Sequence, residues 1–283
     1  MGKKTLKALG IFLAIAFVAT ALFFVNAFFG NPVSAFLAKQ GAQNYLEKHY
    51  CETDYYIEKV SFNFKDTNYH AFIQSPTSQD SSFSLTLGMN GKVWYDTYED
   101  RVLNRFNTAQ RITTAYRAAV DSVIESEDFP YNAHIAFGDI EFKDSDWPAD
   151  ASIPDYALIS NNLELDAEYD IADLGKKAGH LVIYIYDSTV SAERLSEILI
   201  EIKELMNEAG VSFYAIDCVL EYEKGPEGET RDGRVEVMNF LYSDIYEKEL
   251  VKRVKKSNED AIKYYAEMDA VKEAEVKNSA VIP

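Results

Sequence analysis

Hydrophobic and polar positions alternate with period two in several segments of this chain and recur every three or four residues in others. Alternation turns one side of a β-strand toward a core, whereas the wider spacing gives a helix one apolar face. The alternation predicts strands within 56–64, 69–75, 82–89, 135–142, 163–171, 213–222 and 235–242, and a central strand, apolar on both faces, at 181–186. The helical spacing predicts helices over 33–49, 99–126, 191–209 and 246–271.

The first 29 residues differ from the remainder because they contain a long uncharged run. Residues 8–29 carry no charge, and Lys3, Lys4 and Lys7 precede them. The run spans roughly 33 Å as a helix, enough for the ~30 Å hydrocarbon core of a bilayer, and the lysines favour a cytoplasmic N-terminus. We therefore expect a single-pass signal anchor in the cell membrane, with the C-terminal region extracellular. A cleaved signal peptide is the alternative.

Breaks in these patterns divide the remaining chain into two parts. Residues 128–130 (Asp-Phe-Pro) end the second helical segment, and each part contains strands followed by a long helix. The predicted fold is α+β, an N-terminal transmembrane helix followed by two small domains of antiparallel strands packed on long helices. The predicted segments are 1–29 (cytoplasmic stub and anchor), 30–128 (N-terminal domain), 129–272 (C-terminal domain) and 273–283 (flexible tail).

An Asn-Gly pair after residue 89 predicts a hairpin and a specific register for the strand that follows it. A three-residue loop with a left-handed glycine pairs Leu87 with Val93 and Leu85 with Tyr95. A two-residue loop would instead place a carboxylate opposite Leu85. Because a slip of one residue turns every side chain to the other face, we predict that Tyr95 faces the core and Asp96 faces outward.

A short acidic and aromatic motif occurs twice where a predicted strand meets a predicted long helix. Asp96-Thr97-Tyr98-Glu99 resembles Asp244-Ile245-Tyr246-Glu247. Asp three residues before Glu is a capping-box pattern, in which the two carboxylates accept from free amides at the start of a helix. We predict that Asp96, Glu99, Asp244 and Glu247 are helix caps. The alternative is a ligand site, and a deep cleft holding Asp96 or Asp244 beside a second carboxylate would favour a catalytic carboxylate site over a module that only binds a partner.

The chain is acidic, with a formal net charge of −18 at pH 7. Because the first 29 residues hold three lysines and no acid, the remainder carries −21. This balance argues against binding to nucleic acid or to an anionic membrane surface. The sharpest acidic feature is one face of the predicted strand at 163–171, formed by Glu164, Asp166, Glu168 and Asp170. It is either a solvated face that resists aggregation or a candidate surface for a cationic partner.

Sequence motifs for known chemistries are missing from the chain. It contains no Walker loop, Gly-x-Gly-x-x-Gly, Gly-x-Ser-x-Gly or His-Glu-x-x-His, and its four histidines are scattered. No catalytic, cofactor-binding or metal-binding residue is therefore assigned, and catalysis is not expected. Asp144, Asp146 and Asp150 have a calcium-like spacing but lack the glycine and closing glutamate of an EF-hand. Cys51 and Cys218 leave both a single disulfide and two free thiols open.

Four stretches are similar to the YfjL-like family: FFGNPVSAFLAKQGAQNYL, VWYDTYEDRVLNRFNT, YDIADLGKKAGHLVIYIYD and FLYSDIYEKEL. The resemblance implies a membrane-anchored protein of Gram-positive bacteria with an outer α+β region. The family's function is uncharacterised, so no site residues carry over. We expect a membrane-anchored extracytoplasmic binding or regulatory module whose partner is an envelope protein or a cationic molecule. The alternatives are a cell-envelope hydrolase with a dispersed carboxylate site and an acidic calcium- or cell-wall-associated domain.

Overall fold

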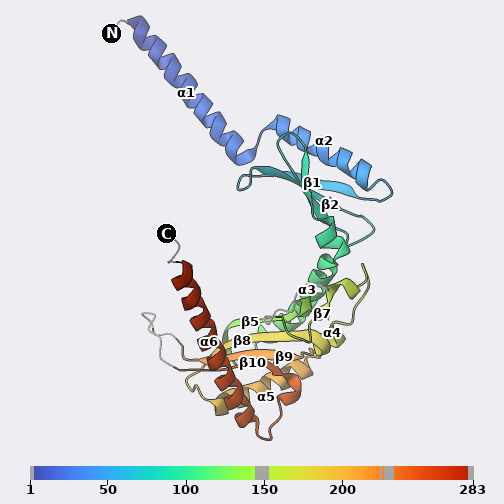
Figure 1. Cartoon of the computed structure of the whole chain (residues 1–283), viewed down its shortest axis with the longest axis vertical. Coiled ribbons are helices and arrows are strands. Elements are labelled where there is room, and N and C mark those ends of the chain that lie inside the picture. The colour runs from blue at the N-terminus through green and yellow to red at the C-terminus, as the bar shows by residue number, and fades with distance from the viewer. Residues whose placement is uncertain (1–2, 144–152, 224, 226–232, 280–283) are drawn as a thin grey trace. The chain divides into compact units, whose positions relative to one another are not determined.

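The computed structural model describes residues 3–143, 153–223, 225 and 233–279 of the 283-residue chain (Figure 1). It divides into two compact units, Met1–Thr108 with Leu163–Ala167, and Ala109–Asn162 with Glu168–Pro283. The division falls after residue 108 rather than after residue 128. Helix α3 (Phe106–Ile124) belongs largely to the second unit because its Tyr116 and Val120 lie against Gly138 of the second sheet.

Helix α1 (Lys3–Phe29) covers the long uncharged run. Among the residues that the structure describes, no helix is long and apolar enough to cross a membrane. The transmembrane helix in the predicted fold is therefore wrong, whereas the α+β class of the rest of the chain is confirmed.

The N-terminal unit is an antiparallel sheet with a helix on one face. The helix is α2 (Pro32–His49), and the strands are β1 (Tyr56–Asn63), β2 (Asn68–Gln74), β3 (Phe83–Leu87) and β4 (Val93–Asp96), in spatial order β1-β2-β3-β4. The buried alternating side chains of β2 and β3 cluster with Ala38, Ala42 and Leu46 of α2. Asn31 caps α2, because its side chain accepts from the Ser34 amide at 2.9 Å.

The β3–β4 hairpin begins in the predicted register and then departs from it. Gly91 has the predicted left-handed backbone, with φ of 79°. Beyond the first pair Trp94 is an extra residue, so Leu85 pairs with Asp96 instead of Tyr95. One extra residue turns the following side chains to opposite faces. Tyr95 is therefore exposed and Asp96 half-buried, so the predicted orientations of these two side chains are wrong.

The helix predicted over 99–126 is broken into a π-helical turn, η1 (Glu99–Leu103), and α3. Between them Arg105 adopts φ of 60°, a left-handed conformation that ends a right-handed helix. The Arg105 guanidinium donates to the carbonyls of Val102 at 2.7 Å and Leu163 at 3.0 Å, which holds the break in place. Apolar spacing continues across the break, so the hydrophobic pattern alone does not reveal it.

The C-terminal unit contains a four-stranded mixed sheet. Its strands are β5 (Asn132–Ile140), β8 (Gly179–Tyr186), β9 (Ala215–Glu221) and β10 (Arg234–Leu241), in spatial order β10-β9-β8-β5. Strands β8 and β9 run parallel because α5 (Ala192–Glu208) forms a crossover between them, which corrects the prediction of antiparallel strands throughout. The short strands β6 (Phe142–Lys143) and β7 (Leu158–Ile159) pair beside it, followed by η2 (Ser160–Asn162) and α4 (Ile171–Ala178).

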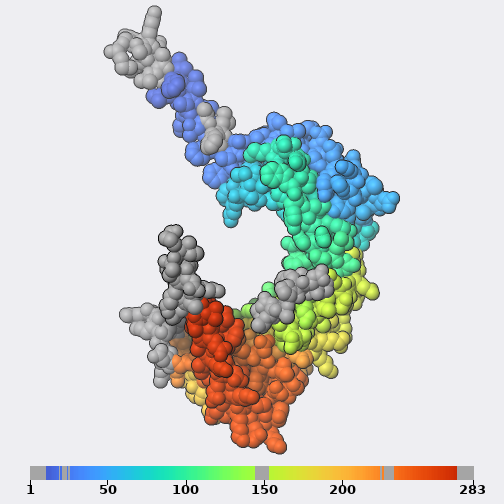
Figure 2. All heavy atoms as spheres, viewed as in Figure 1, coloured from blue at the N-terminus to red at the C-terminus, as the bar shows by residue number. Residues whose placement is uncertain are grey.

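Alternation along β8 and β9 separates the two faces of this sheet. Leu181, Ile183 and Ile185 are fully buried, and the core on that side includes the apolar stripe of α5. His180 and Val182 point to the opposite face. Helix α6 (Leu250–Ser279), which follows the 3-10 turn η3 (Tyr242–Asp244), packs on the edge strand β10. Figure 2 shows α6, in red, against the orange surface of the preceding residues.

Residues 163–171 form no strand, which corrects the predicted acidic face. Asp166 has φ of 59°, and this left-handed conformation interrupts an extended backbone. Its carboxylate accepts from the Asp80 amide at 3.0 Å, and its amide donates to the Asp80 carboxylate at 2.9 Å. Asp170 caps α4 by accepting from two first-turn amides at 3.0 and 3.1 Å. Glu164, Asp166, Glu168 and Asp170 therefore do not share a strand face.

Candidate functional site

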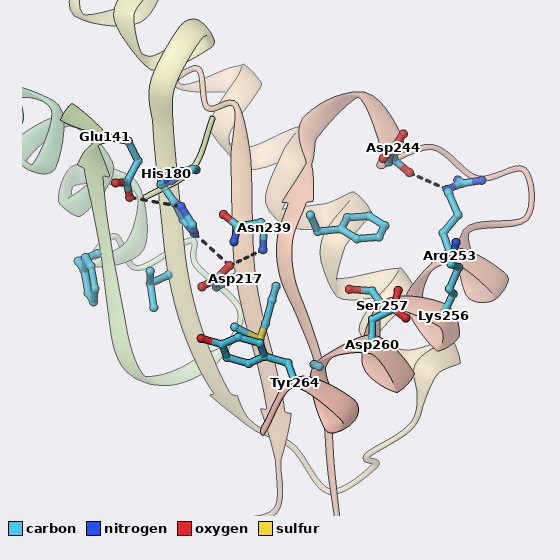
Figure 3. A pocket seen from close by; sticks show the side chains of 16 residues that line it. Glu141, His180, Asp217, Asn239, Asp244, Arg253, Lys256, Ser257, Asp260 and Tyr264 are labelled. Atoms are coloured by element: carbon cyan, nitrogen blue, oxygen red, sulfur yellow. Dashed lines mark hydrogen bonds and ion pairs between the residues drawn. The ribbon is translucent and has the colours of Figure 1, made fainter. Parts of the chain in front are cut away.

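A pocket of about 900 Å³ lies in the C-terminal unit between the sheet and α6 (Figure 3). Its sheet wall carries four polar residues, Glu141, His180, Asp217 and Asn239. Its helix wall carries Arg253, Lys256, Ser257, Asp260 and Tyr264. Phe137, Val182, Met238 and Phe240 add apolar surface. An apolar cavity with a few convergent polar groups is the usual form of a small-molecule site.

His180 is the centre of the sheet wall and is only 7% exposed. Its Nδ1 atom lies 2.8 Å from the Tyr156 hydroxyl and 3.4 Å from Glu141 Oε1. Its Nε2 atom lies 3.1 Å from Asp217 Oδ1, an ion pair that lacks the alignment of a good hydrogen bond. His180, the second residue of β8, is thus held between two carboxylates and a phenol.

A bulge in β10 completes this arrangement. The β9–β10 register shifts between Val237 and Phe240, and Asn239 within the bulge has φ of 47°, a conformation that asparagine tolerates better than most residues. The Asn239 backbone amide donates to Asp217 Oδ1 at 2.6 Å, and its side-chain oxygen accepts from the Tyr156 hydroxyl at 3.1 Å. These contacts join four residues in a closed circuit, which we call the His180 cluster: His180, Tyr156, Asn239 and Asp217.

The electrostatics of the His180 cluster favour a charged imidazole. Burial opposes that charge, but Asp217 and Glu141 outweigh it and raise the pKa of His180 to about 9. Burial and the same two carboxylates also raise the pKa of Tyr156, which keeps its hydroxyl protonated. Because that proton goes to Asn239, the Tyr156 oxygen is free to accept from His180 Nδ1. The His180 cluster therefore holds its histidine as an imidazolium at neutral pH.

On the helix wall, Arg253 is committed to the chain itself. Its three guanidinium nitrogens donate to the carbonyls of Asp244 at 3.0 Å, Lys248 at 2.7 Å and Tyr246 at 2.7 Å. Lys256 and Asp260 differ, because their side chains make no hydrogen bond or ion pair with the residues that the structure describes. Figure 3 shows both beside Ser257 on α6.

The charge left open toward the pocket is mainly acidic. Four carboxylates line it, those of Glu141, Asp217, Asp244 and Asp260. Of its three cationic side chains, His180 and Arg253 are already engaged, and Lys256 remains. Asp244 thus lines the same pocket as the other three carboxylates.

Asp96 and Glu99 occupy the first of the two predicted capping junctions. The Asp96 carboxylate accepts from the Tyr98 amide at 2.8 Å and from the Tyr50 hydroxyl at 2.7 Å. No side-chain cap bond forms at the start of the π-helical turn, where Glu99 is exposed. Asp96 therefore joins the strand end to Tyr50 instead of completing a capping box with Glu99.

Asp244 and Glu247 occupy the second predicted capping junction. Asp244 ends the 3-10 turn, and α6 begins only at Leu250, too late for a capping box formed by Asp244 and Glu247. The Glu247 carbonyl accepts from the Leu250 amide at 3.3 Å, and the Glu247 side chain is exposed. The repeated sequence motif thus leads to two different local structures.

Other sequence candidates do not add to the site. Asp144, Asp146 and Asp150 lie outside the described residues. Within the described ranges no group of three or more histidine, cysteine or acidic side chains is arranged to hold a metal. Cys51 is exposed and Cys218 is buried, and both are free thiols, so the alternative of a disulfide between them does not hold.

Sequence reasoning missed Glu141, His180 and Asp217 as a group. A signal was present, because Asp217 is an acid inside the apolar run of a predicted strand and His180 begins the central strand. A charged side chain in a buried strand requires a partner. Such a residue therefore predicts a partner of opposite charge on a neighbouring strand, although it does not say which strand that is.

Comparisons with known proteins place the chain in one family. Family models described as the YfjL-like N-terminal domain and the YfjL-like C-terminal domain match residues 5–97 and 115–255. No curated protein and no solved structure matches the chain. The interval between the two matches contains the boundary at residue 108 between the two compact units. The two matches together cover most of the sequence, and the chain belongs to the YfjL-like family.

Proposed function

We propose that the C-terminal unit is a binding module without catalysis, and that the pocket between its sheet and α6 is the ligand site. The observation that carries this proposal is the His180 cluster. It commits the most reactive side chain of the pocket, the His180 imidazole, to contacts within the sheet wall. Both ring nitrogens of His180 face protein partners at 2.8 to 3.4 Å. The pocket therefore offers shape and charge, without a histidine that is free to accept a proton.

Acid–base and nucleophilic chemistry are less well supported by the same geometry. A general base works best with a pKa near the working pH, whereas His180, with a pKa of about 9, is protonated there. Burial raises the pKa of the nearby Cys218 thiol to about 12, which removes it as a nucleophile. A hydrolase with a dispersed carboxylate site therefore remains the second candidate, favoured only by the number of carboxylates in the pocket.

The open charges and apolar walls of the pocket suit a cationic ligand with an apolar body. Asp260 and Asp244 offer carboxylates that no described side chain neutralises. Phe137, Phe240 and Tyr264 offer aromatic surface, on which organic cations bind favourably. The proposed ligand group is an amine or guanidinium, carried by a small molecule or by a lysine or arginine side chain of a partner protein.

A titration of the full chain with phenethylamine, followed by calorimetry, tests this proposal. Its uncharged analogue 2-phenylethanol is the control ligand, and we expect it to bind at least about tenfold more weakly. Asp260→Asn is expected to weaken phenethylamine binding by a similar factor. Asp269→Asn is the matched control, because Asp269 is exposed on the same helix and does not line the pocket.

Two outcomes would count against the proposal. Equal affinity for the amine and the alcohol would show that the carboxylates do not select the ligand. Equal behaviour of the Asp260 and Asp269 variants would show that binding occurs elsewhere. Hydrolysis of an ester of an aromatic amino acid that disappears in Asp217→Asn would instead support the hydrolase. A lysine-rich peptide that competes with phenethylamine would identify a partner protein as the source of the cation.

A further inference from the structure

A second pocket, of about 380 Å³, lies on the C-terminal unit and shares no lining residue with the first among the residues that the structure describes. It forms where the last turn of α4, the end of α5, the loop before β9, the end of β10 and η3 meet. The residues that matter for its chemistry are Lys176, Asn207, Ser212, Phe213, Tyr242 and Ser243. Its volume falls within the range of small-ligand sites, roughly 300–1,000 Å³.

The charge of this pocket is opposite to that of the chain. Among the described residues, Lys176 is the only charged one that lines it, in a protein with a formal net charge of −18. Lys176 makes no ion pair within the described ranges, whereas the adjacent Lys177 pairs with Asp173 at 2.6 Å. No carboxylate of the described chain lines the pocket to neutralise Lys176. An uncompensated ammonium beside a cavity favours an anionic ligand.

The neutral polar groups of the pocket include side chains that are able to donate to an anion. The Asn207 side-chain oxygen already accepts from the Tyr242 hydroxyl at 3.0 Å, so its amide nitrogen is the part left to donate. The hydroxyls of Ser212 and Ser243 make no hydrogen bond with other described residues. The Ser212 carbonyl, a possible competing acceptor, takes the Tyr116 hydroxyl at 2.9 Å.

The C-terminal end of α5 does not cancel this preference for an anion. Free carbonyls at the end of a helix carry partial negative charge and would repel an anion. In α5 the Met206 carbonyl accepts from the Val211 amide at 2.8 Å, and the Asn207 carbonyl accepts from the Gly210 amide at 3.0 Å. Gly210 has φ of 72°, the left-handed conformation that such a helix ending uses.

Aromatic side chains form the apolar wall and are held in place. Phe213 is only 2% exposed and meets Tyr242 edge to face, with ring centroids 5.1 Å apart. The Lys203 ammonium lies 4.0 Å from the centre of the Tyr242 ring and donates to the Tyr242 and Ile245 carbonyls at 3.1 and 2.7 Å. The wall is thus built before any ligand arrives, which lowers the cost of binding.

We propose that this second pocket binds the carboxylate of a small aromatic or aliphatic acid. The Lys176 ammonium pairs with the carboxylate, and the Asn207 amide and the two serine hydroxyls donate to its oxygens. The apolar part of the ligand packs on Tyr242, which the buried Phe213 supports from behind. The site is independent of the amine pocket, so the failure of either proposal leaves the other standing.

The test is a titration of the full chain with benzoate, compared with the uncharged isostere benzamide and followed by NMR. We expect benzoate to bind at least about tenfold more tightly than benzamide, because a charge-assisted pair is lost in the amide. Lys176→Gln should weaken benzoate binding about tenfold. Lys177→Gln is the matched control and should bind benzoate as the unmodified chain does, since Lys177 already pairs with Asp173 and does not line the pocket.

Two further measurements keep the test decisive. Outside the pocket, the NMR spectrum of Lys176→Gln should match that of the unmodified chain, which shows that the variant is folded whether or not the amine pocket binds phenethylamine. Ser243→Trp, which fills the cavity, should abolish benzoate binding. The proposal is overturned if benzamide binds as well as benzoate, or if Lys176→Gln and Lys177→Gln behave alike.

Discussion

Each compact unit holds a partly buried carboxylate with an ionisable side chain as its partner, but the two partners differ in charge. In the N-terminal unit the Asp96 carboxylate accepts from the Tyr50 hydroxyl at 2.7 Å and from a backbone amide at 2.8 Å. In the C-terminal unit the Asp217 carboxylate accepts from the Asn239 backbone amide at 2.6 Å and faces the His180 imidazole at 3.1 Å. A neutral phenol serves the first carboxylate and a charged imidazole serves the second.

The difference determines which unit responds to pH near neutrality. Burial and the Asp96 charge raise the pKa of Tyr50 well above its usual value, so the phenol keeps one protonation state. His180 changes charge at a pKa of about 9, only slightly above physiological pH. The contact between Tyr50 and Asp96 is therefore constant across this range, whereas the contact between His180 and Asp217 weakens as the solution becomes alkaline.

Replacement of His180 should have the largest effect on stability. His180→Gln leaves Asp217 and Glu141 on one wall without the cation between them, and loss of a buried charge partner costs about 3–5 kcal/mol of unfolding free energy. His134→Gln is the matched control, because His134 also pairs with a glutamate, at 3.2 Å, but on a more exposed surface. We expect its cost to be below about 1 kcal/mol. Urea denaturation measures the unfolding free energy of both variants. Equal losses of stability in the two would contradict the comparison.

The pH dependence of stability should differ between the units. The pKa of His180 is raised from 6.5 to about 9 in the folded chain, so its stabilisation is complete below pH 6.5 and is lost as the pH rises through 9. The loss is about 3 kcal/mol at most, at 1.36 kcal/mol for each pKa unit. Hydrogen exchange should show weaker protection of β8 at pH 9 than at pH 6.5, and the same protection of β3 at both. The change should vanish in His180→Gln, and parallel changes in both strands would refute a local origin.

Strong periodicity predicted the elements of both units well. The segments 33–49 and 191–209 are helices within about one residue of their predicted ends. Failures occurred where one residue left the regular backbone. Arg105 splits a long helix and Asp166 ends an extended segment, both by adopting positive φ. A non-glycine residue in that conformation is uncommon and depends on tertiary contacts that a sequence pattern does not contain.

The candidate site was harder to predict because its parts are far apart in the chain. His180, Tyr156, Asn239 and Asp217 come from three strands and a loop. The bulge that turns Asn239 toward Asp217 shifts the β9–β10 register, and alternation alone does not reveal such a shift. What the sequence did contain was an acid within an apolar strand. That feature predicts a buried partner but not its identity.

The smallest predicted effect concerns Tyr50, the neutral partner of Asp96 in the N-terminal unit. Tyr50→Phe removes the hydroxyl that donates to Asp96 and leaves this half-buried carboxylate with one donor fewer, which should cost about 1–2 kcal/mol. Tyr95→Phe removes a similar bond, from its hydroxyl to Asp100 at 2.5 Å, but from an exposed position where water replaces it. No measurable change in the urea midpoint is expected there. The cost of Tyr50→Phe should also be the same at pH 6.5 and 9, because burial and the Asp96 charge hold the pKa of Tyr50 well above this range. If it fell with rising pH, charge in the partner would not be what distinguishes the two carboxylates.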